Sequence, residues 1–298
     1  MGVESPVERN PILNSNRGMV VASPYAKGAI ETNRTLQNSE DSLDWWMEVI
    51  SSSFKNLRGD LEKDPNISIV VPACDEEKFV LQLLGSVSNQ KIDKKLEVIM
   101  EVNNSTDRTA EICQKCGVIV DNYKNNEKRS PVAYARQRGL EKAKGDVVVS
   151  IDADQVCEGD KWLENLTKPL FENQNMVLTC GGIKHYDGKW LLLLNPIETI
   201  LRKRRIYKGK EAVGVGFGNV AFKKEVALKT GGWPQTPISE DIGLIEKMMK
   251  MGEVTVVEKA VMRASGRRQM IPIKDQVKEM KRGGNHFFDK NGDLKIVR

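Results

Sequence analysis

The stretch VVVSIDAD, residues 147–154, decides the fold that we expect for this chain of 298 residues. A run of β-branched residues of this length is typical of a strand buried on both faces, as in a parallel sheet. Residues two apart in an extended chain point the same way, so Asp152 and Asp154 should leave the strand end on one side. Ligands of open α/β sheets bind outside the carboxyl ends of the strands, and carboxylates there suit Mg²⁺ or Mn²⁺ carrying a diphosphate. A polar cap that leads from the strand into a loop is the alternative.

Strands and helices alternate on both sides of this stretch. The pattern predicts strands at 67–71, 96–102, 117–120, 176–180, 254–257 and 260–264, and helices at 76–89, 107–116, 132–144 and 161–171. Such alternation predicts βαβ units and a mainly parallel central sheet flanked by helices. Because right-handed crossovers place the loops after the strands along one edge, the polar loops 72–76, 103–107 and 152–154 should converge there.

Composition narrows the class of protein. Hydrophobic residues make up 40% of the chain and charged residues 29%, as in a soluble globular protein. The net charge of +5 gives little support to general nucleic-acid binding. We see no bilayer-spanning apolar run and no secretory signal, so we expect a cytoplasmic protein with reduced thiols. Cys113 and Cys116 should be small buried core residues rather than metal ligands.

Three parts follow one another along the chain. Residues 1–64 combine a polar, partly disordered arm with an amphipathic helix at 43–60. This helix could pack on a membrane, on a partner or, most simply, on its own domain. Residues 65–272 form the main domain, and residues 273–298 form a C-terminal helix and tail.

Five segments in order resemble glycosyltransferase family 2, the inverting nucleotide-sugar transferases with the GT-A fold. They are VVPACDEE (70–77), NNSTDRTAEI (103–112), AYARQRGLEKAKGD (133–146), SIDADQ (150–155), and GNVAFKKEVALKTGGW with SEDIGL (218–233 and 239–244). Each segment alone is weak, but five in order are specific because chance matches multiply. The resemblance covers roughly residues 67–270 and implies a Rossmann-like GT-A fold, with a donor half at 65–155 and a smaller acceptor half at 156–272.

The resemblance also implies a site for a nucleoside-diphosphate sugar, with UDP or GDP as the nucleotide. The donor-binding residues would be Pro72, Ala73, Asp75, Glu76, Asn103, Asn104, Asp107, Arg136, Asp152, Gly218, Asn219, Arg267 and Arg268. For some of these the residues themselves allow another role. Asp107 could equally cap the helix that follows it, Arg136 could be a surface charge, and residues 267–268 could form a solvated basic loop.

For catalysis, the resemblance implies that Asp154 binds Mn²⁺ or Mg²⁺ and that Asp241 is the general base for an acceptor hydroxyl. The cation would act as a Lewis acid on the departing nucleoside diphosphate. A like-charged neighbour, Glu240, should raise the pKa of the base, while the helix N-terminus offsets part of that rise. Simple capping of the helix by these two carboxylates is the alternative. Cys74 and Val102 depart from residues that are common in the family, which leaves the nucleotide open.

A basic stretch at 202–210 bears on the acceptor, which would be a glycan, a lipid-linked group or another hydroxyl compound. It could seat the protein on anionic lipid at the inner face of a membrane, bind a phosphate-bearing acceptor, or form a solvated helix face. A nucleic-acid acceptor is less expected. A catalytically silent GT-A scaffold is a further alternative, against which the intact Asp152, Asp154 and Asp241 argue.

Overall fold

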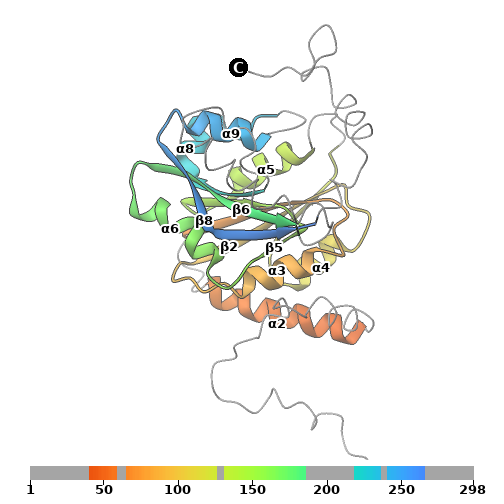
Figure 1. The fold of residues 1–298 in the computed structure, drawn as a ribbon. Helices are drawn as coiled ribbons and strands as arrows, with labels where there is room; N and C mark the ends of the chain where they lie inside the picture. Colours follow the sequence, from red (N-terminus) through yellow and green to blue (C-terminus); the bar gives the residue numbers. More distant parts are fainter. Residues whose placement is uncertain (1–39, 59–64, 126–130, 186–217, 236–239, 266–298) are drawn as a thin grey trace, which may run out of the picture.

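A computed structural model describes residues 40–58, 65–125, 131–185, 218–235 and 240–265. An eight-stranded sheet in the order β3-β2-β1-β4-β7-β6-β8-β5 runs through this part of the chain, and helices cover both of its faces (Figure 1). The predictions for the N-terminal arm, the basic stretch at 202–210, Arg267, Arg268 and the C-terminal tail lie outside the described residues.

The first half of the sheet has the parallel arrangement that the sequence predicts. It consists of β3 (Ile119–Tyr123), β2 (Leu96–Asn103), β1 (Ile67–Ala73) and β4 (Val147–Ile151), with β1 parallel to both β2 and β4. Every residue of β4 and of β2 is buried, because helices cover both faces of these strands. The crossovers contain α3 (Val80–Ser88), α4 (Thr109–Lys115) and α5 (Pro131–Lys142).

The second half of the sheet is mixed. It consists of β5 (Gln155–Cys157), β6 (Met176–His185), β7 (Asn219–Lys223) and β8 (Glu253–Ala264), together with α6 (Trp162–Glu172), α8 (Lys224–Lys229) and α9 (Glu240–Met248). β7 runs antiparallel to β4 and β6, while β8 is parallel to β6 and antiparallel to β5. The two short strands predicted at 254–257 and 260–264 are one strand. Gly181 pairs with Val257 and the next residue, Gly182, pairs with Val261, so the gap between the two predicted strands is a bulge in β8.

Two apolar cores fill the layers on either side of the sheet. One lies between the sheet and α2, α3, α4 and α6, and the other lies beneath α5, α8 and α9 (Figure 1). The amphipathic helix α2 (Glu40–Arg58) buries Met47, Ile50 and Phe54 in the first core and packs on α3 and α4. It thus packs on its own domain, the simplest of the alternatives. None of the described helices is long and apolar enough to span a bilayer.

The pair of cysteines on α4 belongs to this core. Cys113 and Cys116 are buried among apolar side chains, as the sequence predicts. Burial raises the pKa of the Cys116 thiol to about 12, so a reactive thiolate is not expected there.

Candidate functional site

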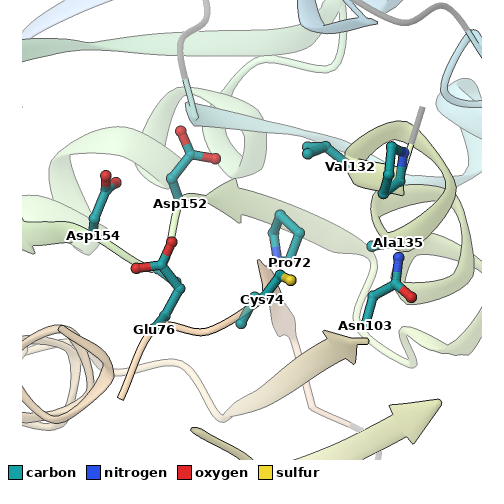
Figure 2. A pocket seen from close by; sticks show the side chains of 11 residues that line it. Pro72, Cys74, Glu76, Asn103, Val132, Ala135, Asp152 and Asp154 are labelled. Atoms are coloured by element: carbon teal, nitrogen blue, oxygen red, sulfur yellow. The ribbon is translucent and has the colours of Figure 1, made fainter. Parts of the chain in front are cut away.

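The loops that follow β1, β2 and β4 meet at one edge of the sheet, because these strands are neighbours and run the same way. Together with the start of α5 they form a cleft of about 470 Å³, counted with its open mouth. Its lining residues are Pro72, Ala73, Cys74, Glu76, Asn103, Pro131, Val132, Ala135, Asp152, Ala153 and Asp154. Figure 2 shows the carboxylates Glu76, Asp152 and Asp154 on one side of this cleft and Asn103 with the start of α5 on the other.

The first two of these loops are fastened to each other by hydrogen bonds. Asp75 has a left-handed backbone (φ +53°); its N–H donates to Ser105 Oγ at 2.9 Å, and its carboxylate accepts from the Thr106 N–H at 2.7 Å. The Glu76 N–H donates to Thr109 Oγ1 at 2.8 Å. Such contacts fix an otherwise costly backbone conformation, and they give Asp75 a structural role at the rim of the cleft.

Asp107 and Asn104 complete this fastening. The Asp107 carboxylate accepts the N–H groups of Thr109 at 2.9 Å and Glu77 at 3.0 Å. Burial alone would raise the pKa of Asp107, but a hydrogen bond from the Thr109 hydroxyl, together with these two backbone contacts, outweighs burial and lowers the pKa. The Asn104 amide exchanges two hydrogen bonds with the backbone of Asn125, at 2.9 and 3.1 Å. The N-cap position of α4 is Arg108, and Asp107, one residue before it, accepts the first N–H of the helix. Nucleotide contacts by Asp107 or Asn104 stay predictions.

Asn103 is different, because its side chain is 4% exposed and lines the cleft. Neither Nδ2 nor Oδ1 has a hydrogen-bond partner within the described part of the chain. An unpaired buried polar group costs about 1–3 kcal/mol. A ligand group that both donates and accepts a hydrogen bond would remove this cost.

Two carboxylates at the end of β4 are candidates for holding a divalent cation. Asp152 and Asp154 both line the cleft (Figure 2). Extended-chain alternation is not the reason, because β4 ends at Ile151 and the chain then turns, with the Gln155 N–H donating to the Asp152 carbonyl at 3.2 Å. Among the described residues, no three His, Cys, Asp or Glu side chains form a group that could hold a metal ion alone. Mg²⁺ or Mn²⁺ bound through one or two carboxylates would take its remaining oxygens from a diphosphate and water. The donor set present fits a cation of that kind.

Arg136 joins the end of β4 to the start of α9. Its side chain, 3% exposed, donates from Nη2 to Asp152 Oδ1 at 2.6 Å and from Nη1 to Glu240 Oε1 at 2.7 Å. The guanidinium also lies over the ring of Trp233, 5.0 Å from its centroid. Arg136 is therefore not a surface charge. Through this one residue, Glu240 and the neighbouring buried Asp241 are held beside the strand end that carries Asp152.

Negative charge exceeds positive charge around Arg136, because this one cation faces the carboxylates of Asp152, Glu240 and Asp241. Burial would lower the pKa of Arg136, but Asp152, Glu240 and Asp241 together raise it. Burial raises the pKa of Glu240, and the attraction of Arg136 only partly offsets this effect while Asp241 adds to it. Repulsion by Asp241 thus contributes to the raised pKa of Glu240, and the pKa rise expected for Asp241 itself stays a prediction.

Gly218 and Asn219 follow at the start of β7. Gly218 has φ +68°, and a Cβ atom on it would lie 2.3 Å from Asp152 Oδ2, so this position requires glycine. Asn219 is fully buried; it accepts from Trp162 Nε1 at 3.2 Å and donates to the carbonyls of Gly182 and Ala260 at 2.8 and 3.1 Å. Contact between Asn219 and a donor sugar would have to replace one of these bonds.

Several residues around the cleft escaped the sequence reasoning. The start of α5 contributes Pro131, Val132 and Ala135 to the lining. Proline at the first position of a helix marks where the helix begins, and that signal was available in the sequence. The contact of Trp233 with Arg136 has no local signal.

The fold and this edge of the sheet define the chain as a GT-A-type α/β protein with an acidic strand-end cleft. The family model of glycosyl transferase family 2 matches residues 68–230, more than half of the chain. The chain therefore belongs to glycosyl transferase family 2.

Known proteins agree with this assignment. The chain is 26% identical over 207 residues to the probable glycosyltransferase YdaM of Bacillus subtilis, covering 65% of this chain and 49% of YdaM. It spans about half the length of the curated relatives that it matches.

Two solved structures share the fold. The mannosyltransferase PcManGT from Pyrobaculum calidifontis, in complex with GDP-Man and Mn²⁺, matches with a TM-score of 0.55 at 18% identity, covering 75% of this chain and 68% of that chain. Glucosyl-3-phosphoglycerate synthase from Mycobacterium tuberculosis, in complex with Mn²⁺, UDP-glucose and phosphoglyceric acid, matches with a TM-score of 0.51 at 20% identity, covering 76% and 78%. At such identities the likeness shows the fold, which is the GT-A arrangement predicted from the sequence.

Proposed function

We propose that the protein is a metal-dependent inverting glycosyltransferase, which moves a sugar from a UDP- or GDP-sugar to an acceptor hydroxyl. The observation that carries this proposal is the meeting of distant carboxylates at one edge of the sheet. Asp152 follows β4, Glu240 and Asp241 begin α9, and one buried arginine lies between Asp152 and Glu240. The solved structures with GDP-Man and UDP-glucose support the class of donor.

In the donor half, the cleft offers a place for each part of a nucleoside diphosphate. The unpaired amide of Asn103 can pair with the edge of a base, and Pro72, Ala73 and Val132 supply apolar walls beside it. Asp154, with Asp152 close by, would hold Mn²⁺ or Mg²⁺ through carboxylate oxygens. When bound, the cation would supply positive charge against the diphosphate, which leaves as the sugar is transferred.

In the acceptor half, Asp241 would take the proton of the acceptor hydroxyl. The hydroxyl oxygen would form a bond to the anomeric carbon on the face opposite the nucleoside diphosphate, and the bond from that carbon to the phosphate oxygen would break. Inversion follows from attack on the opposite face. A carboxylate is suited to this task where burial and neighbouring charges bring its pKa nearer to neutrality.

The experiment that tests the proposal is a donor screen in two steps. Thermal unfolding is measured with UDP-, GDP-, CMP- and dTDP-sugars, each with Mn²⁺, with Mg²⁺ and with EDTA, and nucleotide release is then measured for the sugars that stabilise the protein. We expect metal-dependent stabilisation by a UDP- or GDP-sugar, and nucleotide release that disappears in Asp154→Ala. If no sugar nucleotide stabilises the protein in the presence of either metal, the proposal is wrong.

The catalytically silent scaffold gives a different result in the same screen. A scaffold would be stabilised by nucleotide but would release none from the sugar, with any metal. Release of nucleotide that responds to Asp154→Ala would exclude it. The acceptor and any contact with a membrane stay predictions, because the basic stretch at 202–210 that suggested them lies outside the described residues.

A further inference from the structure

The side chain of Arg136 is arranged to hold other protein groups rather than a ligand. Both of its terminal nitrogens are engaged by carboxylates, Asp152 on one side and Glu240 on the other, at 2.6 and 2.7 Å. The side chain is buried at 3% exposure, and Nε is buried as well, without a hydrogen-bond partner in the described part of the chain. Burial and two charge-assisted hydrogen bonds, which are among the stronger polar contacts in proteins, therefore oppose the approach of a donor diphosphate to the guanidinium.

The surroundings of Arg136 also fix its direction. The ring of Trp233 covers the guanidinium, with its centroid 5.0 Å away. The backbone N–H of Trp233 donates to Oε1 of Gln137, which lies on α5 beside Arg136, at 2.8 Å. Gly232 allows this approach, because a Cβ atom there would lie 2.1 Å from Gln137 Oε1. The guanidinium is thus held from the side by α5 and Trp233, and it can present its nitrogens only toward the start of α9 and the end of β4.

We propose that Arg136 and Glu240 form a positioning pair, which holds the start of α9, and with it Asp241, against Asp152 at the end of β4. In this role Arg136 acts through the two carboxylates and does not bind the donor diphosphate. The inference rests on the proposed function for what Asp241 does there. The new element is that a buried ion pair, between residues 104 positions apart in the chain, positions the Asp241 carboxylate relative to the end of β4.

Two substitutions separate this role from that of a diphosphate ligand. If the pair positions Asp241, Arg136→Met lowers kcat for nucleotide release from the donor by about 100-fold, because a small displacement of a reacting group has that cost. KM for the donor then stays within about threefold of wild type, because the substitution removes no contact with the bound donor. Glu240→Gln, which keeps the shape and removes the charge, lowers kcat in the same direction, and the double variant is no worse than Arg136→Met alone.

A ligand of the diphosphate predicts the reverse pattern. Arg136→Met would then raise KM strongly, while Glu240→Gln would free the guanidinium and leave kcat unchanged. That pattern, or losses from the two variants that simply multiply in the double variant, would overturn the proposal. Because Glu240→Gln is isosteric, it still gives a decision if Arg136→Met does not fold.

A matched control exists on the same helix. Arg138 also has two carboxylate partners, Glu101 and Asp121, and lies over the ring of Tyr123 at 4.2 Å. Arg138 is more exposed, at 29%, and its two partners also pair with Lys142. Arg138→Met removes ion pairs away from α9, so it should lower stability somewhat but leave kcat as it is.

A readout without turnover separates failure of this inference from failure of the proposed function. Amide hydrogen exchange at residues 240–248 should become faster in Arg136→Met and Glu240→Gln and stay unchanged in Arg138→Met. If wild type releases no nucleotide from any sugar in the screen, the proposed function fails, while exchange still tests the pair. Unchanged exchange at α9 in both variants would overturn the pair itself.

Discussion

The two halves of the site are built by different means. In the proposed donor half, several side-chain to backbone hydrogen bonds join the loops after β1 and β2, among them those of Asp75 and Asp107. In the acceptor half, the start of α9 is connected to the strand end through the buried guanidinium of Arg136. Damage to the first should therefore appear as weaker binding of the donor, and damage to the second as slower chemistry.

The largest expected effect lies in the acceptor half. Asp241→Asn keeps the shape of the side chain but removes its ability to accept a proton, so nucleotide release should fall by about 100-fold or more. Thermal stabilisation by the donor and metal should persist. The check is kcat beside a binding titration of the same variant. Retained turnover would remove Asp241 from the role of base.

The second prediction concerns the close approach of Gly218, at the start of β7, to Asp152 at the end of β4. Gly218→Ala brings a Cβ atom to 2.3 Å from Asp152 Oδ2 at φ +68°, so both the backbone and the carboxylate must move. We expect a loss of stability of about 1–2 kcal/mol from the left-handed backbone and a further fall in nucleotide release. Chemical denaturation and initial rates measure the two parts.

Gly159→Ala is the matched control for this substitution. Gly159 has φ +83°, but a Cβ atom there meets nothing within 4 Å. It should show the backbone cost alone, with an unchanged rate. Equal rates in the two variants would show that the contact of Gly218 with Asp152 is unimportant.

A smaller effect is expected in the donor half. Asn103→Leu replaces the unpaired buried amide with an apolar group of similar size, so stability should stay level or rise. Affinity for the nucleotide should fall by about tenfold, the cost of a hydrogen bond or two. Isothermal titration with UDP and with GDP measures this loss. A stronger effect on one nucleotide than on the other would identify the base, and equal affinity to wild type would exclude Asn103 from recognition.

The smallest effect concerns a carboxylate outside the site. Burial raises the pKa of Glu101, and attraction by Lys142 and Arg138 only partly offsets this. A carboxyl with a raised pKa in the folded state stabilises the protein most when it is protonated, so its contribution falls as pH rises above about 4.5 through the folded pKa. Glu101→Gln should flatten that part of the stability profile between pH 4 and 7, as measured by urea midpoints, without changing nucleotide release. An unaltered slope would show that Glu101 does not titrate in this range.

The sequence predicted the parts of the molecule that depend on local pattern. The Val147–Ile151 run, the alternation of strands and helices, and the carboxylates at the end of β4 follow from periodicity and from the rules of parallel sheets. The partners of Arg136 could not be predicted in this way, because Asp152 and Glu240 lie 16 and 104 residues from it and meet only through tertiary packing. For Asp107, the sequence left two roles open, since one carboxylate can cap a helix or bind a ligand with the same atoms.

The position of α2 has a practical consequence for the boundaries of the domain. The family match begins at residue 68, yet Met47, Ile50 and Phe54 complete a core that α3 and α4 share, and Asp44 pairs with Lys115 at 2.9 Å. A fragment that begins at residue 68 would lack α2 and expose the apolar surface of α3 and α4 to solvent, so the purified fragment should aggregate. Expression trials, and comparisons with shorter relatives, should therefore begin upstream of residue 40.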